Sequence, residues 1–492
     1  TGVWSKQAGT ISIANSIVSA TTDGTAGNCA AIGRGYTSND AQAIPVSITN
    51  SIVTATNAVG KGDSISSGGD SDVTINNSIV SVSAGSDSAG SPTLSGSYTV
   101  LENQSLNIPA GSTLTLAEGA VLTNTGIIVN SGTITGDGSS QNDGTMYNIG
   151  EGKIDIIPTG TPIEDITAIK YLDESGKELS VTNYTLLTPD TASWNDGWYV
   201  ALGLVNIPSR VTVIGDVHLI LADGCSLNAT KGINVSDPNS LTIYGQDKGT
   251  GALTATGADW QAGIGGNSSL AAGGRKAAAG TITINGGKVT ATGGYQNVGI
   301  GGVSGGGTIT INGGLVYAAG SNFSEGIGGR NDDNTITING GTVKATGGYQ
   351  GAGIDGSYAS AITITGGTVN ATGGDNAAGI GGGNGVGYGG IYGGSGGTIT
   401  ISGGSVTATG NGGGAGIGSG NGSEGGTFST GTNGHVVIIA NSIRDNTSDD
   451  WSGVIFQGQT GAVYGADIAP AEDFTLPAGS TLTIETGKTL TI

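Results

Sequence analysis

The chain repeats one phrase at a nearly constant interval. Residues 282–293 read ITINGGKVTATG, and close variants begin at residues 309, 336, 362 and 399. Each is followed by a second phrase, G-I-G-G or a variant, whose isoleucines stand 27, 27, 26 and 37 residues apart, at Ile300, Ile327, Ile354, Ile380 and Ile417. A fixed period of about 20 to 50 residues is typical of solenoids, in which each repeat buries its apolar side chains only against its neighbours.

Each repeat contains three short runs that alternate in steps of two. Residues 281–284 read TITI, residues 289–292 read VTAT, and the run at 262–265 reads AGIG. Alternation of this kind predicts strands with Ile, Val and Ala directed inward and with Thr and Gly directed outward. Because parallel crossovers are almost always right-handed, the sequence predicts an all-β fold, a right-handed parallel β-helix with about three strands per coil.

The composition of this chain is unfavourable for some classes of binding partner. It has 98 glycines, only 11% charged residues and a formal net charge of −21. Nucleic acid is an unfavourable partner for such a chain, because phosphate binding needs clustered Lys and Arg. No apolar run has the length that a membrane-spanning helix requires, so we expect no membrane insertion.

The two cysteines, Cys29 and Cys225, stand in different segments. Cys225 shares a face with apolar residues in the run LADGCSLNA, so we expect a buried free thiol there rather than a disulfide.

Changes of rhythm divide the chain into four parts. Residues 1–136 read as the C-terminal part of a first β-solenoid module, and the polar, Gly-rich residues 137–160 as a linker. Residues 161–203 form a non-repeating lead-in in which YLDESGKEL predicts a hairpin, and residues 204–492 form a second β-helix module. Since both ends fall within the pattern, we expect the chain to be a piece of a longer protein.

Acidic residues gather where the glycine phrase changes. Asp355 replaces the usual Gly, and the preceding repeat contains Glu325, Arg330, Asp332 and Asp333. Two carboxylates on adjacent coils would suit a glycosidase, whereas Asp332, Asp333 and Asp355 would suit Ca²⁺; apart from such a Ca²⁺ ion we expect no cofactor. The third interpretation is that loops of an acidic protein bring carboxylates together by chance, with Arg330 as a local counter-charge.

Aromatic residues precede the G-I-G-G phrase at similar positions, namely Trp260, Tyr295, Phe323 and Tyr349. Aromatic rings stack on the apolar C–H faces of sugars, so these four residues, with Arg330, are candidate ligand-binding residues. The alternative is that they pack at turns. Trp194, Trp198 and Tyr199 are expected in the core of the lead-in.

The phrases DGWYVALG, VHLILADGC and NSLTIYGQ, with GTITINGG and AGIGGG, resemble a group of large surface proteins of Gram-positive gut bacteria, described as carbohydrate-binding or β-strand-repeat proteins. The resemblance covers most of residues 162–430 and is weaker over 1–135. It implies a secreted, cell-wall-associated protein built on a right-handed parallel β-helix. Glycosidases and lyases also use this fold, but no catalytic motif of theirs can be matched to residues here.

Two functional hypotheses result. The first is an extracellular, non-enzymatic module on the bacterial cell wall that binds a glycan or polysaccharide, or acts as an adhesive stalk. The alternative is a glycoside hydrolase or polysaccharide lyase that uses Glu325, Asp332, Asp333 and Asp355 as catalytic carboxylates.

Overall fold

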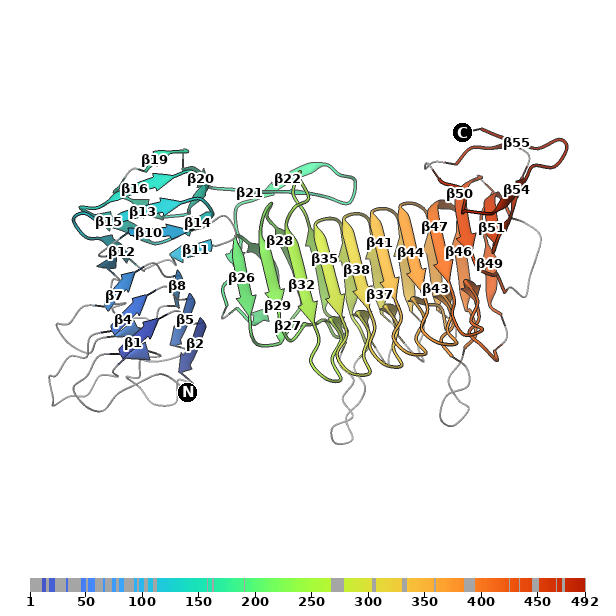
Figure 1. Ribbon diagram of the computed structural model, residues 1–492, viewed down its shortest axis with the longest axis horizontal. Helices are drawn as coiled ribbons and strands as arrows, with labels where there is room; N and C mark the ends of the chain where they lie inside the picture. The colour runs from blue at the N-terminus through green and yellow to red at the C-terminus, as the bar shows by residue number, and fades with distance from the viewer. Residues whose placement is uncertain are drawn as a thin grey trace. The chain divides into compact units, whose positions relative to one another are not determined.

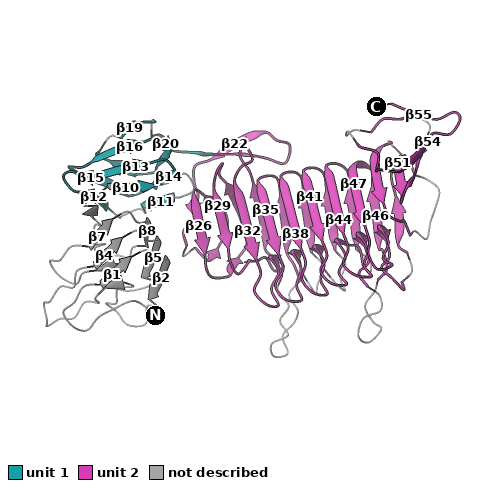
Figure 2. Cartoon of the chain, viewed as in Figure 1, with its two compact units in different colours: residues 1–169 teal, residues 170–492 magenta. Residues whose placement is uncertain are grey.

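The computed structural model divides the chain into two compact units, residues 1–169 and 170–492 (Figure 1, Figure 2). Before residue 113 it describes strands alone, with side chains only from Thr99 onward. Beyond that it describes residues 113–156, 158–161, 163–189, 191–266, 278–302, 307–329, 334–357, 360–384, 394–423, 425–432, 434–444, 451–465, 467–470 and 474–491.

The first unit consists of stacked strands that form several sheets, and every pairing described between them is parallel. The longest sheet contains, in order, β1 (Ile11–Ala14), β4 (Val46–Thr49), β7 (Val73–Asn76), β9 (Thr93–Leu94), β12 (Thr113–Leu116), β15 (Thr133–Gly136) and β18 (Lys153–Ile154). Two four-stranded sheets contain β10 (Ser97–Val100), β13 (Val121–Asn124), β16 (Ser139–Asn142) and β19 (Thr159–Gly160), and β11 (Ser105–Ile108), β14 (Ile127–Asn130), β17 (Thr145–Ile149) and β20 (Glu164–Ile166). The remaining sheets contain β2 (Ile17–Thr22), β5 (Ile52–Asn57) and β8 (Ile79–Ser83), and β3 (Ile32–Gly33) and β6 (Ile65–Ser66).

The segment 137–160, which we predicted to be a linker, instead carries β16 to β19 and continues the first solenoid. Its inward positions include polar residues, so the apolar alternation that identifies a strand is weak. Asn142 is fully buried, and its Oδ1 accepts a 2.7 Å hydrogen bond from Asn124 Nδ2 on the coil below. Stacked asparagines thus take the place of apolar side chains there.

The second unit is a longer stack whose three sheets each receive one strand per coil (Figure 1). One sheet contains β23 (Thr185–Leu186), β25 (Gly197–Ala201), β28 (Asp216–Leu221), β31 (Ser240–Tyr244), β34 (Thr281–Ile284), β37 (Thr308–Ile311), β40 (Thr335–Ile338), β43 (Ala361–Ile364), β46 (Thr398–Ile401) and β49 (Thr427–Ser429). A second contains β26 (Leu204–Ile207), β29 (Ser226–Ala229), β32 (Ala252–Thr256), β35 (Lys288–Thr292), β38 (Leu315–Ala319), β41 (Thr342–Thr346), β44 (Thr368–Thr372), β47 (Gly403–Thr409), β50 (His435–Ala440), β51 (Gly453–Gln457), β52 (Thr460–Tyr464) and β54 (Thr481–Thr483). The third contains β24 (Ser193–Trp194), β27 (Val211–Val213), β30 (Ile233–Asn234), β33 (Ile264–Gly265), β36 (Ile300–Gly301), β39 (Ile327–Gly328), β42 (Ile354–Asp355), β45 (Ile380–Gly381) and β48 (Ile417–Gly418).

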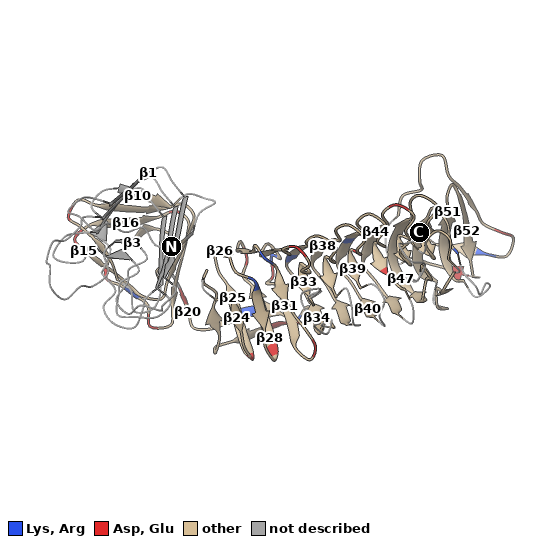
Figure 3. Ribbon diagram, turned by 90° about the horizontal axis from the view of Figure 1, so that it is seen from below, with Lys and Arg blue, Asp and Glu red and all other residues tan. Residues whose placement is uncertain are grey.

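This stacking confirms the predicted right-handed parallel β-helix with three strands per coil, and one coil is called a rung below. Ile282, Ile284 and Val289 are fully buried, whereas Thr281 is exposed. Ile282 pairs in register with Ile309, so equivalent isoleucines stack from rung to rung. Burial of such side chains stabilises the fold by about 1.5–3 kcal/mol each. Figure 3 shows that charged residues are sparse along these stacked strands.

The glycines of the third strand are buried, although we expected them to face outward. A Cβ atom built on Gly263 would lie 2.7 Å from the backbone nitrogen of Thr292, and one on Gly265 would lie 1.9 Å from the Gly301 carbonyl oxygen. At these two positions the third strand passes so close to its neighbours that only glycine fits.

The lead-in joins the second solenoid earlier than the predicted boundary at residue 204, because β23 to β25 already stack on its first rungs. The predicted hairpin is present as β21 (Ile169–Leu172) and β22 (Glu178–Val181). Its turn is held by Asp173, whose Oδ1 accepts a 2.9 Å hydrogen bond from the Lys177 backbone N–H. The N–H of Leu172 donates to the Gly245 carbonyl at 3.0 Å, which fixes the hairpin to the outside of the β-helix.

The C-terminal end departs from parallel stacking. β51 and β52 pair antiparallel, and β54 then pairs with β52 in parallel. The last pair consists of β53 (Asp467–Ile468) and β55 (Thr489–Leu490). A small separate core fills this end, made of Val437, Val454, Phe456, Val463 and Ile468.

Cys225 is free and buried, as predicted, and burial raises the pKa of its thiol to about 12. Cys29 lies outside the described residues. Within the part of the chain that is described, no helix has the length and apolar character needed to cross a membrane.

Candidate functional site

The four aromatic residues noted in the sequence lie at the corner that precedes each third strand. Tyr295 and Tyr349 each precede the strand isoleucine by five residues, and Trp260 and Phe323 precede it by four. These isoleucines pair in register from Ile264 through Ile300 and Ile327 to Ile354. The four rings therefore lie at one corner of four successive rungs, and we call Trp260, Tyr295, Phe323 and Tyr349 the aromatic corner.

The aromatic corner is made of two ring pairs. Trp260 and Tyr295 have centroids 5.3 Å apart at 87°, and Phe323 and Tyr349 have centroids 5.4 Å apart at 81°. Both pairs have the edge-to-face geometry that aromatic quadrupoles favour. The tyrosines remain 43% and 51% exposed, whereas Trp260 and Phe323 are half-buried. Each pair thus presents one tyrosine to solvent and supports it with a second ring.

The backbone at this corner is unusual. Successive rungs place non-glycine residues in the left-handed region, with φ of 65° at Trp260, 54° at Gln296, 60° at Phe323, 64° at Gln350 and 61° at Asn376. This conformation costs an L-residue about 1–2 kcal/mol and is a marked outlier for a bulky side chain.

Another corner of the same rungs has glycine at its left-handed positions, as is usual. There the left-handed positions hold Gly287, Gly314 and Gly341, with φ of 77°, 84° and 79°. Glycine is therefore available to this chain at left-handed positions, yet Trp260, Gln296, Phe323, Gln350 and Asn376 occupy such positions on five successive rungs. Strained residues of this kind cluster at functional sites.

Polar side chains accompany the rings. Gln296 Nε2 donates to the Tyr295 hydroxyl at 3.3 Å. Farther along the corner, Asn376 Nδ2 donates to Asp375 Oδ2 at 2.9 Å, and Asn421 Nδ2 donates to Asn376 Oδ1 at 2.9 Å. Rings at one end and amides with a carboxylate at the other can contact both the C–H faces and the hydroxyls of a ligand.

The predicted acidic residues do not form an open site among the described residues. Glu325 is 2% exposed and Asp355 is fully buried. Glu325 occupies the position where other rungs place Ala or Val facing the interior, which explains its burial. Asp355 lies in register with Gly381 and accepts hydrogen bonds from the Ser357 backbone N–H at 3.2 Å and the Ser357 hydroxyl at 2.5 Å.

Arg330, Asp332 and Asp333 lie outside the described residues, so their roles in catalysis, ligand binding or calcium binding stay predictions. Within the described residues, no group of three or more His, Cys, Asp or Glu could hold a metal ion.

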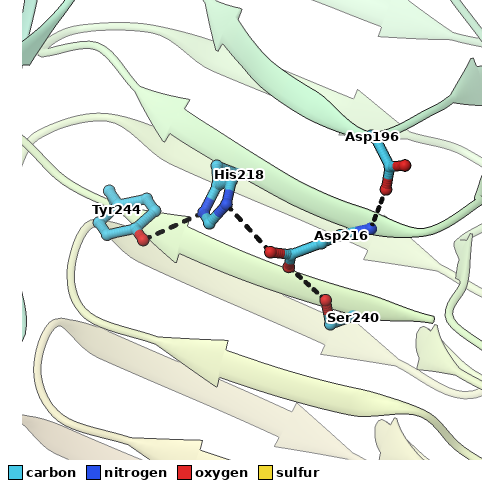
Figure 4. Close-up of polar contacts among 5 residues, drawn as sticks. All are labelled: Asp196, Asp216, His218, Ser240 and Tyr244. Atoms are coloured by element: carbon cyan, nitrogen blue, oxygen red, sulfur yellow. Dashed lines mark hydrogen bonds and ion pairs between the residues drawn. The ribbon is translucent and has the colours of Figure 1, made fainter. Parts of the chain in front are cut away.

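A second polar cluster, which the sequence did not indicate as a site, lies on the first rungs (Figure 4). His218 Nε2 lies 3.3 Å from Asp216 Oδ2, and its Nδ1 lies 3.2 Å from the Tyr244 hydroxyl. The Ser240 hydroxyl donates to Asp216 Oδ1. Asp216 thus stands between serine and histidine, so the histidine does not contact the serine as a nucleophilic triad requires.

The cluster has a structural explanation in the hairpin. Trp198 stacks on His218 at 4.5 Å, and Tyr171 of β21 packs against Trp198 at 4.7 Å and edge-on against Tyr244 at 4.8 Å. Burial raises the pKa of Tyr244 to about 12. Trp194 and Tyr199 are buried in the core as predicted, whereas Trp198 points outward into this cluster.

Arg210 is a further residue that sequence reasoning missed. Its guanidinium donates to the carbonyls of Lys231 at 2.7 Å and Ala262 at 3.0 Å, which lie on successive rungs. Burial lowers its pKa to about 10. Because its donors satisfy backbone carbonyls, this cation serves the stacking of the first rungs.

Comparison with known proteins bears on the architecture. A family model described as Beta helix repeat matches residues 282–307, 309–329, 336–358, 362–384 and 399–421. No curated protein and no solved structure matches the chain. The matched segments are the rungs that contain β34 to β48, and they include three of the four rings of the aromatic corner. The chain is therefore a parallel β-helix protein that carries beta helix repeats.

Proposed function

We propose that this protein is a non-enzymatic glycan-binding module and that the aromatic corner is its binding surface. The observation that carries the proposal is the presence of large and polar side chains at five left-handed positions where glycine would be less strained. A surface that must present rings and amides to a ligand gains from this choice.

The two exposed tyrosines supply the contact. Tyr295 and Tyr349 are among the most exposed large apolar side chains of the second unit, and each is held edge-to-face by a neighbouring ring. Rings held in this way bind sugars without losing much side-chain freedom. The low positive charge of the chain agrees with an uncharged ligand rather than nucleic acid.

We also propose that the module acts outside a bacterial cell, either secreted or attached to the cell wall, where its ligand would be a glycan or polysaccharide. The support is the resemblance of its phrases to surface proteins of Gram-positive gut bacteria. An adhesive role on that surface would use the same corner.

The hydrolase or lyase alternative has no support from the described residues. Glu325 and Asp355 are covered, so neither faces a polysaccharide. A hydrolysis screen of any bound glycan, with Asp355→Asn as the comparison, tests this directly. Product formation that disappears in the Asp355→Asn variant would favour the enzyme.

A glycan array tests the proposal. The full chain should bind at least one glycan class, and the double variant Tyr295→Ala with Tyr349→Ala should lose that signal. Tyr317, which is 41% exposed on β38 and outside the corner, provides the matched control through Tyr317→Ala. Absence of binding to every glycan, or binding that survives the double variant, would contradict the proposal.

A further inference from the structure

We infer that the aromatic corner takes a neutral, extended, β-1,4-linked glycan that lies along the solenoid axis. This inference rests on the proposed function and adds the class of ligand and its direction. It comes from the order in which side chains follow one another along the corner.

Two adjacent columns of side chains run along the corner, one residue per rung in each. The outer column, which is exposed throughout, contains Asp259, Tyr295, Asn322, Tyr349 and Asp375. The inner column, which is half-buried and left-handed throughout, contains Trp260, Gln296, Phe323, Gln350 and Asn376. Aromatic and polar residues alternate in both columns over the first four rungs, and the two columns are offset by one rung.

The alternation gives the surface a repeat of two rungs. Parallel strands lie about 4.8 Å apart, so Tyr295 and Tyr349 repeat over about 9.6 Å along the axis. The polar residue between them in the outer column is Asn322, whose amide can donate to and accept from a hydroxyl. A matching ligand offers an apolar face every 9.6 Å or so and hydroxyls in between.

An extended β-1,4-linked chain of pyranoses has this form. Its successive rings turn over, so that every second ring presents the same face, and two sugars span nearly the same length as two rungs. The chain is straight, as a ligand along a straight solenoid corner must be. An α-1,4-linked glucan coils instead, and its rings leave the line of the two tyrosines.

The charge of the corner distinguishes between neutral and anionic extended glycans. Asp259 and Asp375 are both exposed in the outer column, and the chain as a whole carries a net charge of −21. A polyuronate would meet repulsion at both ends of the corner, whereas a neutral glycan would not. Of these two classes, the corner therefore favours the neutral glycan.

Titration calorimetry of the full chain against oligosaccharides of defined length tests the inference. We expect Kd for β-1,4-linked glucose oligomers to fall about tenfold between the disaccharide and the hexasaccharide, because only the longer chain reaches both tyrosines. Tyr349→Ala should remove this gain from length and leave the disaccharide affinity nearly unchanged. Tyr349→Phe, which keeps the ring, and Tyr317→Ala, which lies outside the corner, should retain it.

Two ligand controls separate the outcomes. Equal or tighter binding of α-1,4-linked glucose oligomers, or of oligogalacturonate, would overturn the inference and leave the proposed function standing. Failure of every glycan to bind would overturn both. A Tyr317→Ala variant that loses the gain from length as fully as Tyr349→Ala would also overturn the inference, because the effect would not belong to the corner.

Discussion

At the scale of single residues, the left-handed positions are of two kinds: those where the fold requires glycine and those whose side chains we assign to function. Gly341 and Gln350 lie on the same rung with φ of 79° and 64°. At Gly341 a Cβ atom would lie 2.6 Å from the Gly314 carbonyl oxygen, so glycine is required by space as well as by conformation. At Gln350 a side chain is present despite the conformation, which we attribute to the ligand.

This difference predicts opposite effects of two substitutions. Gln350→Gly should leave the free energy of unfolding unchanged or raise it by up to about 1 kcal/mol, because relief of left-handed strain exceeds the entropy that glycine loses. Gly341→Ala should lower it by about 1–3 kcal/mol. Chemical denaturation monitored by circular dichroism measures both. A loss of more than about 1 kcal/mol in Gln350→Gly would show that the side chain serves packing, contrary to our interpretation.

The sequence predicts which strand side chains point inward and which point outward, but it did not reveal the role of the buried acids Glu325 and Asp355. Alternation in TITI places Ile282 and Ile284 inward because the strand has a period of two. Glu325 follows the same period and is buried for that reason, yet its chemistry suggested a solvent-facing site. The pattern of the rung overrides the ordinary preference of a carboxylate for water.

At the scale of elements, side-chain ladders connect one rung to the next. Asn312 Nδ2 donates to Asn285 Oδ1, and Asn339 Nδ2 donates to Asn312 Oδ1, both at 2.8 Å. Thr365 closes the series by donating its hydroxyl to Asn339 Oδ1 at 2.8 Å. The ladder follows the turn after each first strand and fixes those turns relative to one another.

The two inner members of this ladder, Asn312 and Asn339, each take part in two of its hydrogen bonds and should matter most. Asn312→Ala removes two hydrogen bonds and is expected to lower the free energy of unfolding by about 1–3 kcal/mol. Thr335→Ala, on the exposed face of β40, is the control and should change it by less than about 0.5 kcal/mol. Urea denaturation of both variants provides the comparison. Equal effects of the two substitutions would mean that the ladder adds no stability.

Elements were predictable where apolar residues alternate and unpredictable where asparagine takes their place. The rungs from β34 to β48 were located from sequence because Ile, Val and Ala mark nearly every inward position, Glu325 being an exception. The strands of 137–160 were not, because Ser140 and Asn142 occupy inward positions and are buried. The pairing of Trp260 with Tyr295 was likewise not predictable, since it depends on the register between rungs.

At the scale of the whole molecule, the second unit is a linear array in which each rung contacts mainly its neighbours, although the Arg210 side chain reaches two rungs along to Ala262. Its stability is therefore close to a sum of local terms, and a defect in the middle weakens the coupling between the two sides. The stacked isoleucines of the third sheet provide the place to introduce one, because Ile327 is fully buried between Ile300 and Ile354.

Ile327→Ala should lower the free energy of unfolding by about 2–5 kcal/mol and broaden the transition. Hydrogen exchange should become faster in β36, β39 and β42 and remain nearly unchanged in β28 and β50, which lie several rungs away. Uniformly faster exchange across the unit would instead indicate that the solenoid unfolds as one cooperative block.

The two-rung alternation of the aromatic corner also constrains how such a protein can change in length. Tyr295 and Tyr349 are 54 residues apart, and each needs a ring from the rung before it. Duplication of a single rung would give the corner a longer scaffold but would break the order of rings and amides. Only an inserted segment of two rungs preserves the order, so the natural unit of gene duplication for the binding surface is twice the unit that suffices for the fold.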